Sequence, residues 1–184
     1  MNRSLLILGL ASVIAVFAAG CSATAPNYSP YMENMRALKA QGAGVNKISS
    51  AVTANKNLGD MTCRLSMLVA LPEGATYETY IDNALKSELQ AAGVYEAASP
   101  QKATVELQSV TFNSNIGFGS WTIEGTARVG NDAPFPVAVK HKFDASYAFW
   151  QACADVANAF VPATQEFLNT LINAPQFQAL LKGQ

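Results

Sequence analysis

The clearest pattern along the chain is an alternation of apolar and polar residues in four segments. Alternation with a period of two predicts strands that bury one face and leave the other more polar. In the second of these strands the apolar positions change face near Gln108 and Ser109, which indicates a β-bulge. The expected strands are 62–71, 103–113, 120–129 and 135–143.

Turn sequences rich in glycine separate the last three expected strands. Gly117-Phe118-Gly119 lies between the second and the third, and Gly130-Asn131-Asp132 lies between the third and the fourth. Connections this short join neighbouring antiparallel strands. We therefore expect an antiparallel meander.

Helical spacing of apolar residues marks the segment between the first strand and the meander. Thr76 is suited to cap a helix whose apolar stripe continues to Gly93, a residue type common just past helix ends. Weaker patterns upstream predict a short helix over 31–41, a strand over 45–53 and a polar loop over 54–60.

The C-terminal segment is also expected to be helical. Pro162 is expected to restart or kink this helix, and Pro175 to open a last short one. The apolar stripe expected to face the core consists of Tyr147, Trp150, Cys153, Ala157 and Phe160.

This order of elements predicts an α+β fold, a two-layer α/β sandwich with one mostly antiparallel sheet of four to five strands and the helices on one face. The strand over 62–71 reaches the meander through the helix that Thr76 caps. It should therefore pair in parallel with a meander strand through a right-handed crossover.

The first segment of the chain has the pattern of an export signal. Arg3 precedes an apolar run from Leu5 to Phe17, and small residues then lead to Cys21. The run is too short for a membrane-spanning helix, which needs about 20 apolar residues. We expect residues 1–20 to be cleaved, 21–60 to hold the N-terminus and a flexible tether over 22–30, and 61–184 to form one globular domain.

Ala18-Ala19-Gly20-Cys21 resembles the lipobox of bacterial lipoproteins, although that motif usually has Leu where this chain has Ala18. The resemblance implies that the thiol of Cys21 carries lipid and anchors the protein in a membrane. Ser22 stands where a signal for inner-membrane retention would have Asp, so the resemblance favours the periplasmic side of the outer membrane. An ordinary secreted protein with Cys21 in its tail is the alternative.

The charge balance argues against nucleic acid as a partner. The chain has 12 basic and 13 acidic residues, and loss of Arg3 with the signal leaves 11 against 13, a net charge of −2. Without a basic excess there is no electrostatic attraction for phosphate backbones. Charged residues make up only 14% of the chain. Such a weakly charged surface suits contact with a partner, but it also suits a plain exported protein.

Two further cysteines, Cys63 and Cys153, each lie on the apolar side of their element. Export places them where disulfides form, so we expect them to be bonded to each other. Two buried free thiols are the alternative, since unpaired cysteine is often fully buried.

The residues offer little catalytic chemistry. His141, the one histidine, lies on the apolar face of its strand with no acid or cysteine at a motif spacing, which favours a locally hydrogen-bonded imidazole over a base or metal ligand. No Gly-x-Ser-x-Gly motif is present. We expect no enzyme, cofactor or metal, and Phe118 on its turn is the best candidate for an exposed contact residue.

The order of elements together with the lipobox resembles small lipoproteins that assist envelope transport, such as the lipopolysaccharide-assembly lipoprotein and the auxiliary lipoproteins of lipid transporters. The resemblance implies a non-enzymatic accessory protein that binds another envelope protein. A carrier of lipid or of a small ligand is the second possibility, and an enzyme of unknown type the third.

Overall fold

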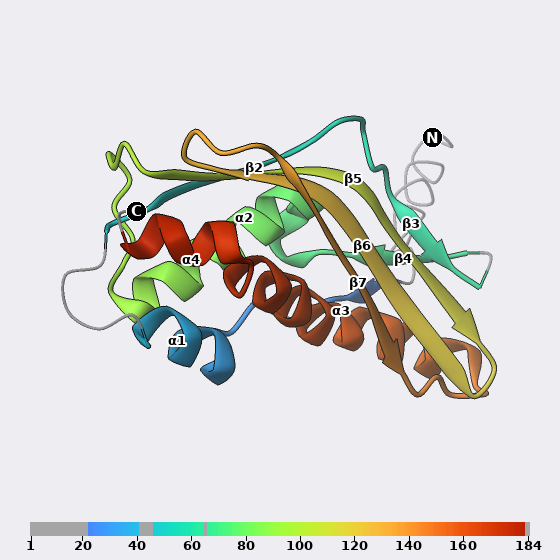
Figure 1. Cartoon of the computed structure of the whole chain (residues 1–184). Coiled ribbons are helices and arrows are strands. Elements are labelled where there is room, and N and C mark those ends of the chain that lie inside the picture. The colour runs from blue at the N-terminus through green and yellow to red at the C-terminus, as the bar shows by residue number, and fades with distance from the viewer. Residues whose placement is uncertain (1–21, 41–45, 65, 183–184) are drawn as a thin grey trace, which may run out of the picture.

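The computed structural model describes residues 22–40, 46–64 and 66–182. In these ranges the chain forms two sheets, with the helices on one side of the larger one (Figure 1). The predicted α+β class is confirmed, although the strands form a three-stranded and a four-stranded sheet instead of one. The four-stranded sheet has the order β2 (Ser49–Ala54), β5 (Lys102–Asn115), β6 (Phe118–Val129) and β7 (Phe135–Phe143).

The predicted meander is confirmed: β5 pairs with β6, and β6 with β7, both antiparallel. The register of β5 against β6 shifts between Leu107 and Ser109, where the apolar positions change face in the sequence. Gly117 joins the two strands with a φ of 87°, a left-handed conformation that glycine adopts without steric cost.

The predicted parallel pairing is present, but with a different strand. β2 runs parallel to β5, with Ser49 opposite Lys102 and Ala54 opposite Leu107. The stretch 62–71 does not join this sheet. It divides into β3 (Met61–Cys63) and β4 (Met67–Ala70), which form an antiparallel hairpin. Both arms of a hairpin alternate with the same period, so the pattern could not distinguish them from one long strand without a glycine or proline between them.

The expected flexible tether over 22–30 is wrong. Ser22–Thr24 forms β1, which pairs in parallel with β4 and completes the three-stranded sheet. Ala23 and Ala25 are buried in the core. A short run of small residues before Pro26 gave too weak a pattern for this strand to be recognised.

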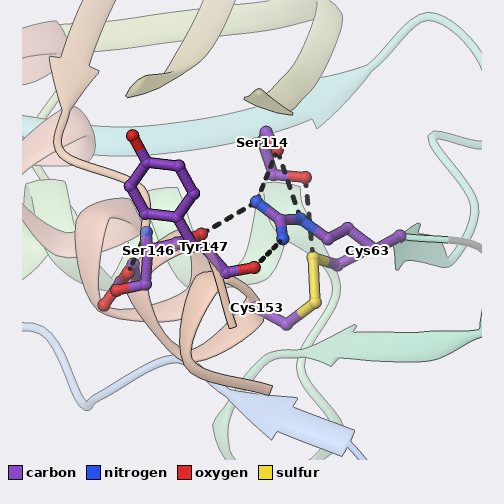
Figure 2. Close-up of a disulfide and its surroundings, with 7 residues drawn as sticks. Cys63, Ser114, Ser146, Tyr147 and Cys153 are labelled. Carbon is purple, nitrogen blue, oxygen red and sulfur yellow. Dashed lines mark hydrogen bonds between the residues drawn. A yellow bond between two sulfur atoms is a disulfide. The ribbon is translucent and has the colours of Figure 1, made fainter. Parts of the chain in front are cut away.

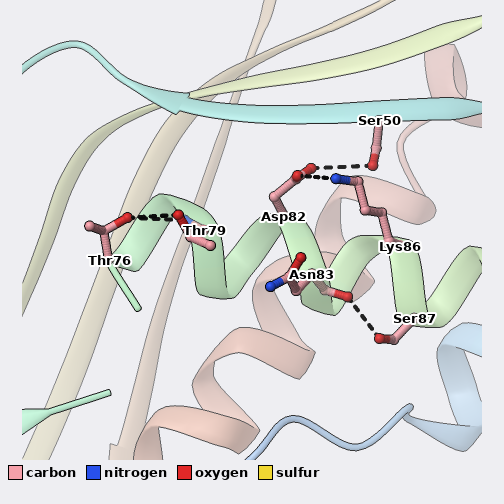
Figure 3. A network of polar contacts seen from close by, with 7 residues as sticks. All are labelled: Ser50, Thr76, Thr79, Asp82, Asn83, Lys86 and Ser87. Carbon is pink, nitrogen blue, oxygen red and sulfur yellow. Dashed lines mark hydrogen bonds and ion pairs between the residues drawn. The ribbon is translucent and has the colours of Figure 1, made fainter. Parts of the chain in front are cut away.

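Helix α2 (Tyr77–Ala92) has the predicted ends. The hydroxyl of Thr76 accepts a hydrogen bond from the backbone N–H of Thr79, and Gly93 closes the helix with a φ of 76°. Figure 3 shows the contact of α2 with β2: Asp82 pairs with Lys86 on its own helix, at 2.5 Å, and accepts a hydrogen bond from Ser50 of β2.

Helix α3 (Phe149–Ile172) runs through Pro162 without ending, and it packs against β6 and β7. At the centre of the core the ring of Phe160 lies 4.7 Å from Trp121 and 5.4 Å from Tyr77, between centroids. The short helices α1 (Met32–Lys39) and α4 (Pro175–Lys182) complete the helical layer. Within the described ranges no helix has the length and apolar character that crossing a membrane requires.

Candidate functional site

A disulfide joins the three-stranded sheet to helix α3 (Figure 2), at the end of the molecule that holds the β5–β6 turn. It links Cys63 of β3 to Cys153 of α3, with 5.6 Å between their Cα atoms, and both residues are fully buried. The predicted bridge is confirmed. Cys21, the predicted site of lipidation, lies outside the described residues.

Arg64 follows the first of these cysteines and ties three segments together. Its guanidinium donates hydrogen bonds to the carbonyl oxygens of Ser114 at 3.2 Å, of Ser146 at 2.9 Å and of Tyr147 at 2.9 Å (Figure 2). A planar fork of five N–H donors can satisfy several carbonyls at once. Arg64 has a φ of 44°, a left-handed conformation that is uncommon for a residue other than glycine. The β3–β4 turn is thereby fixed to the end of β5 and to the loop before α3.

Asp155 of α3 fixes the same loop from the other side. Its carboxylate accepts hydrogen bonds from the backbone N–H of Ser146 at 2.9 Å and from the side chain of Gln151 at 3.0 Å. Partial burial acts to raise the pKa of this carboxyl, but the hydrogen bonds from Ser146 and Gln151 outweigh it and lower the pKa. Asp155 and Arg64 thus both hold the loop before α3 at Ser146, one at its N–H and the other at its carbonyl.

Five large apolar side chains remain exposed at this end of the molecule, and we call them the aromatic end. Gly117, in the β5–β6 turn, donates its N–H to the carbonyl of Ala145, which brings this turn beside the loop before α3. The five residues, with their exposed fractions, are Ile116 at 62%, Phe118 at 61%, Tyr147 at 79%, Phe149 at 37% and Trp150 at 67%.

The aromatic end agrees with one prediction and contradicts another. Phe118 is exposed as predicted, although it is the first residue of β6, just after the turn, and its role in contacts stays a prediction. Tyr147 and Trp150 were expected in the core stripe of α3, and that expectation is wrong. Tyr147 precedes the helix, which begins at Phe149, and in its first turn the side chain of Trp150 faces solvent.

His141 lies at the edge of the sheet, and the fold brings an acid to it that sequence spacing did not reveal. Its Nδ1 is 2.9 Å from a carboxylate oxygen of Glu166 on α3. The pair borders an open hollow of about 420 Å³ that is also lined by Tyr31, Gln165 and Asn169. Among the described residues no group of three or more His, Cys, Asp or Glu could hold a metal ion. The arrangement fits the local hydrogen bonding that the sequence favoured.

Glu88 is a buried carboxylate that was not predicted from the sequence. One of its oxygens accepts hydrogen bonds from the Tyr28 hydroxyl, from the backbone N–H of Tyr31 at 2.8 Å and from the Asn34 side chain at 3.0 Å. Burial, followed by the contact with Glu88, raises the pKa of Tyr28. These bonds hold the segment after β1 against α2. The signal was present, because position 88 falls on the apolar stripe of α2 beside Leu89.

The fold of this chain is similar to that of known structures. A crystal structure of a Xanthomonas campestris protein of family DUF330 aligns with a TM-score of 0.53 and 14% identity, over 89% of this chain and 95% of that one. A candidate lipoprotein from Caulobacter crescentus aligns with a TM-score of 0.43 and 11% identity, over 82% of this chain and 96% of that one. The rare lipoprotein B of Shewanella oneidensis aligns with a TM-score of 0.38 and 10% identity, over 68% of this chain and 93% of that one.

The first of these alignments defines the class: the chain has an α+β fold like that of the Xanthomonas protein. No protein-family model matches the sequence, and no curated protein matches it either.

Proposed function

We propose that this chain is a lipid-anchored accessory protein of the bacterial envelope, without catalytic activity, that works on the periplasmic side of the outer membrane by binding another envelope component. The observation that carries the proposal is the position of Ser22. This residue directly follows the lipobox cysteine and is the first residue of β1 in the folded domain.

A strand at this position changes what the anchor does. Acyl chains on Cys21 hold a protein at a bilayer because each buried methylene contributes about 0.8 kcal/mol. With no spacer between Cys21 and β1, the domain stays at the membrane surface instead of reaching away from it. Ser22, where an inner-membrane retention signal would have Asp, supports the outer membrane as the destination.

Binding is supported by the side of the four-stranded sheet opposite the helices (Figure 1). Its exposed positions carry threonine and a mixture of charges, represented by Thr111 and Glu106 on β5, Glu124 on β6 and Lys140 on β7. Rows of such side chains on a rigid sheet offer a broad surface to a partner. The buried carboxylate of Glu88, in contrast, is used to hold the fold together.

Crosslinking from this surface tests the proposal. A photoreactive amino acid at Thr111 or at Glu124 should capture the same envelope protein repeatedly in intact cells. The matched control carries the group at Glu33 on α1, on the other side of the molecule, and should not capture it. The variant Cys21→Ser should lose the captured partner, because it is no longer held at the membrane. Repeated recovery of the chain alone from the sheet positions would contradict the proposal.

A small-ligand carrier is the second candidate, and one observation favours it. A hollow of about 330 Å³ between the loop 57–60, β4 and the start of α2 is lined by Leu58, Val69 and Tyr77 among others. The Tyr77 hydroxyl is buried and has no hydrogen-bond partner among the described residues. Volumes of this order hold small ligands. Native mass spectrometry of the protein from its own membranes would show a retained mass if this candidate is right, and only the bare lipoprotein if it is wrong.

A further inference from the structure

We propose that the aromatic end inserts into the surface of the same bilayer that holds the lipid anchor, so that the domain contacts the membrane at two points and has a fixed orientation. This inference rests on the proposed lipid anchor at Cys21. It adds an interaction surface, Ile116, Phe118, Tyr147, Phe149 and Trp150, and names lipid as its occupant.

The first support is the position of this surface relative to the anchor. Ser22 pairs with Leu68 of β4, and Leu68 pairs with Thr62 of β3. The next residue, Cys63, is bonded to Cys153, which follows Trp150 by one helical turn. Strand spacing and helix rise place Trp150 within about 25 Å of Ser22. Ser22, the residue that follows the proposed anchor, therefore lies at the same end of the molecule as the aromatic end.

The second support is the chemistry of the surface. Trp and Tyr concentrate where hydrocarbon meets headgroups, because their rings are apolar and their N–H or O–H can still hydrogen-bond. Ile116 and Phe118 add apolar side chains that can reach below the headgroups. The two segments that carry the surface, 114–118 and 145–151, contain no acidic residue that lipid phosphates would repel. They contain no lysine or arginine either, although the guanidinium of Arg64 binds the loop before α3 and the exposed Asp144 directly precedes it.

The third support is that the surface is preformed. Arg64 and Asp155 hold the loop before α3, and the disulfide holds the first turns of that helix. Apolar side chains on a fixed scaffold lose little conformational entropy on binding. The uncovered face of the four-stranded sheet stays free for the partner under the proposed function.

Bromine quenching of tryptophan fluorescence tests the inference. The lipoprotein is purified from membranes of cells that express the full chain and is reconstituted into phosphatidylethanolamine and phosphatidylglycerol vesicles with brominated acyl chains. The chain has two tryptophans, of which Trp121 is fully buried and Trp150 is exposed. A Trp150 ring in the headgroup boundary, where Trp side chains concentrate, should be clearly quenched by the bromine atoms. The variant Trp150→Phe, which reports Trp121 alone, should show almost no quenching.

A paired set of variants ties the quenching to the surface. Ile116→Ser combined with Phe118→Ser should clearly reduce quenching of Trp150, because the neighbouring turn no longer inserts. The matched control is Met32→Ser on α1, an exposed apolar residue on another part of the molecule, and it should leave quenching unchanged. Thermal melts of each variant establish that it is folded before it is compared.

Two outcomes would overturn the inference: unquenched Trp150 in bilayer-bound protein, or capture of a protein instead of lipid by a photoreactive group at Tyr147 in intact membranes. The second result would assign the surface to a protein partner.

Whether Cys21 carries lipid is measured separately, from the mass of the N-terminal peptide. If Cys21 carries no lipid, its thiol can be coupled to a maleimide lipid in the same vesicles, since Cys63 and Cys153 are bonded to each other. Trp150 quenching there still decides whether the aromatic end inserts, while the missing acyl groups alone would contradict the proposed function.

Discussion

The centre of the molecule and its disulfide end are held together by different forces. At the centre, Trp121, Phe160 and Tyr77 stack in a closed core with helices on one side of the sheet. At the other end, the small β1-β4-β3 sheet buries Ala23, Met67 and Val69 against the core. A disulfide to α3 and the hydrogen bonds of Arg64 to the loop before α3 hold it as well. Apolar burial supports the first region by itself, whereas in the second a covalent bond adds to it and large apolar side chains stay exposed.

Removing the disulfide should have the largest effect. Cys63 and Cys153 are 90 residues apart, and a crosslink closing a loop of this length contributes about 4 to 5 kcal/mol in the chain-entropy model. The variant Cys63→Ala with Cys153→Ala should lose about this much free energy of unfolding in urea titrations. Reductant should bring the wild type to the same value and leave the variant unchanged. A loss below about 1 kcal/mol would show that the disulfide end is held by other contacts.

A cavity at the centre of the core should have the second-largest effect on stability. Phe160→Ala removes a fully buried ring between Tyr77 and Trp121 and should reduce the free energy of unfolding by about 3 to 5 kcal/mol. Phe149→Ala, the same substitution in the first turn of the same helix, removes a partly exposed ring at the aromatic end and should cost less than about 1 kcal/mol. If chemical denaturation showed equal losses of unfolding free energy for the two variants, the contrast between the core and the disulfide end would be wrong.

Alkaline pH should weaken the core more than the disulfide end. Burial raises the pKa of Tyr77 and of Tyr80 to about 12, so the folded state keeps their protons when the unfolded chain loses them. This contribution is complete below pH 10 and is lost as the pH rises from 10 to 12. At pH 11 the free energy of unfolding should be lower by about 1.4 kcal/mol for each of the two tyrosines. Urea titrations at pH 9 and pH 11 measure the loss, and unchanged stability would contradict this assignment.

Two hydroxyl deletions should show the smallest effects. The Tyr80 hydroxyl donates to the carbonyl of Pro26 at 2.9 Å, so Tyr80→Phe should cost about 1 kcal/mol and loosen the segment after β1. The Tyr77 hydroxyl has no partner among the described residues, so Tyr77→Phe should be neutral or slightly stabilising. Thermal melts of the two variants provide the comparison. A larger loss from Tyr77→Phe would reveal a partner for that hydroxyl.

The sequence was most informative where the pattern is local. Alternation in β5 to β7 predicted the meander and even the bulge before Ser109, because side-chain period reports directly on a sheet with one buried face. The disulfide was predicted from two cysteines on apolar faces in a chain with the pattern of an export signal. Both predictions needed only the neighbours of each residue and the compartment.

The missed features depend on contacts between distant segments. The left-handed turn at Arg64 is made possible by carbonyls 50 and more residues away, at Ser114 and Ser146, so no local pattern showed that 62–71 is a hairpin. β1 forms only because β4 offers it an edge. Trp150 had the spacing of a core residue but lies in the first turn of α3, beyond the region that the sheet covers, and this is why the aromatic end was not recognised.

The central claim is that a lipid on Cys21 holds the domain directly at a membrane, since β1 begins at the next residue. Mass spectrometry of the N-terminal peptide of the mature protein, taken from the outer-membrane fraction, tests it most directly. We expect a peptide that begins at Cys21 and carries the mass of a diacylglyceryl group with or without a further acyl chain. A mature protein with an unmodified Cys21, found outside the membrane fractions, would contradict the account.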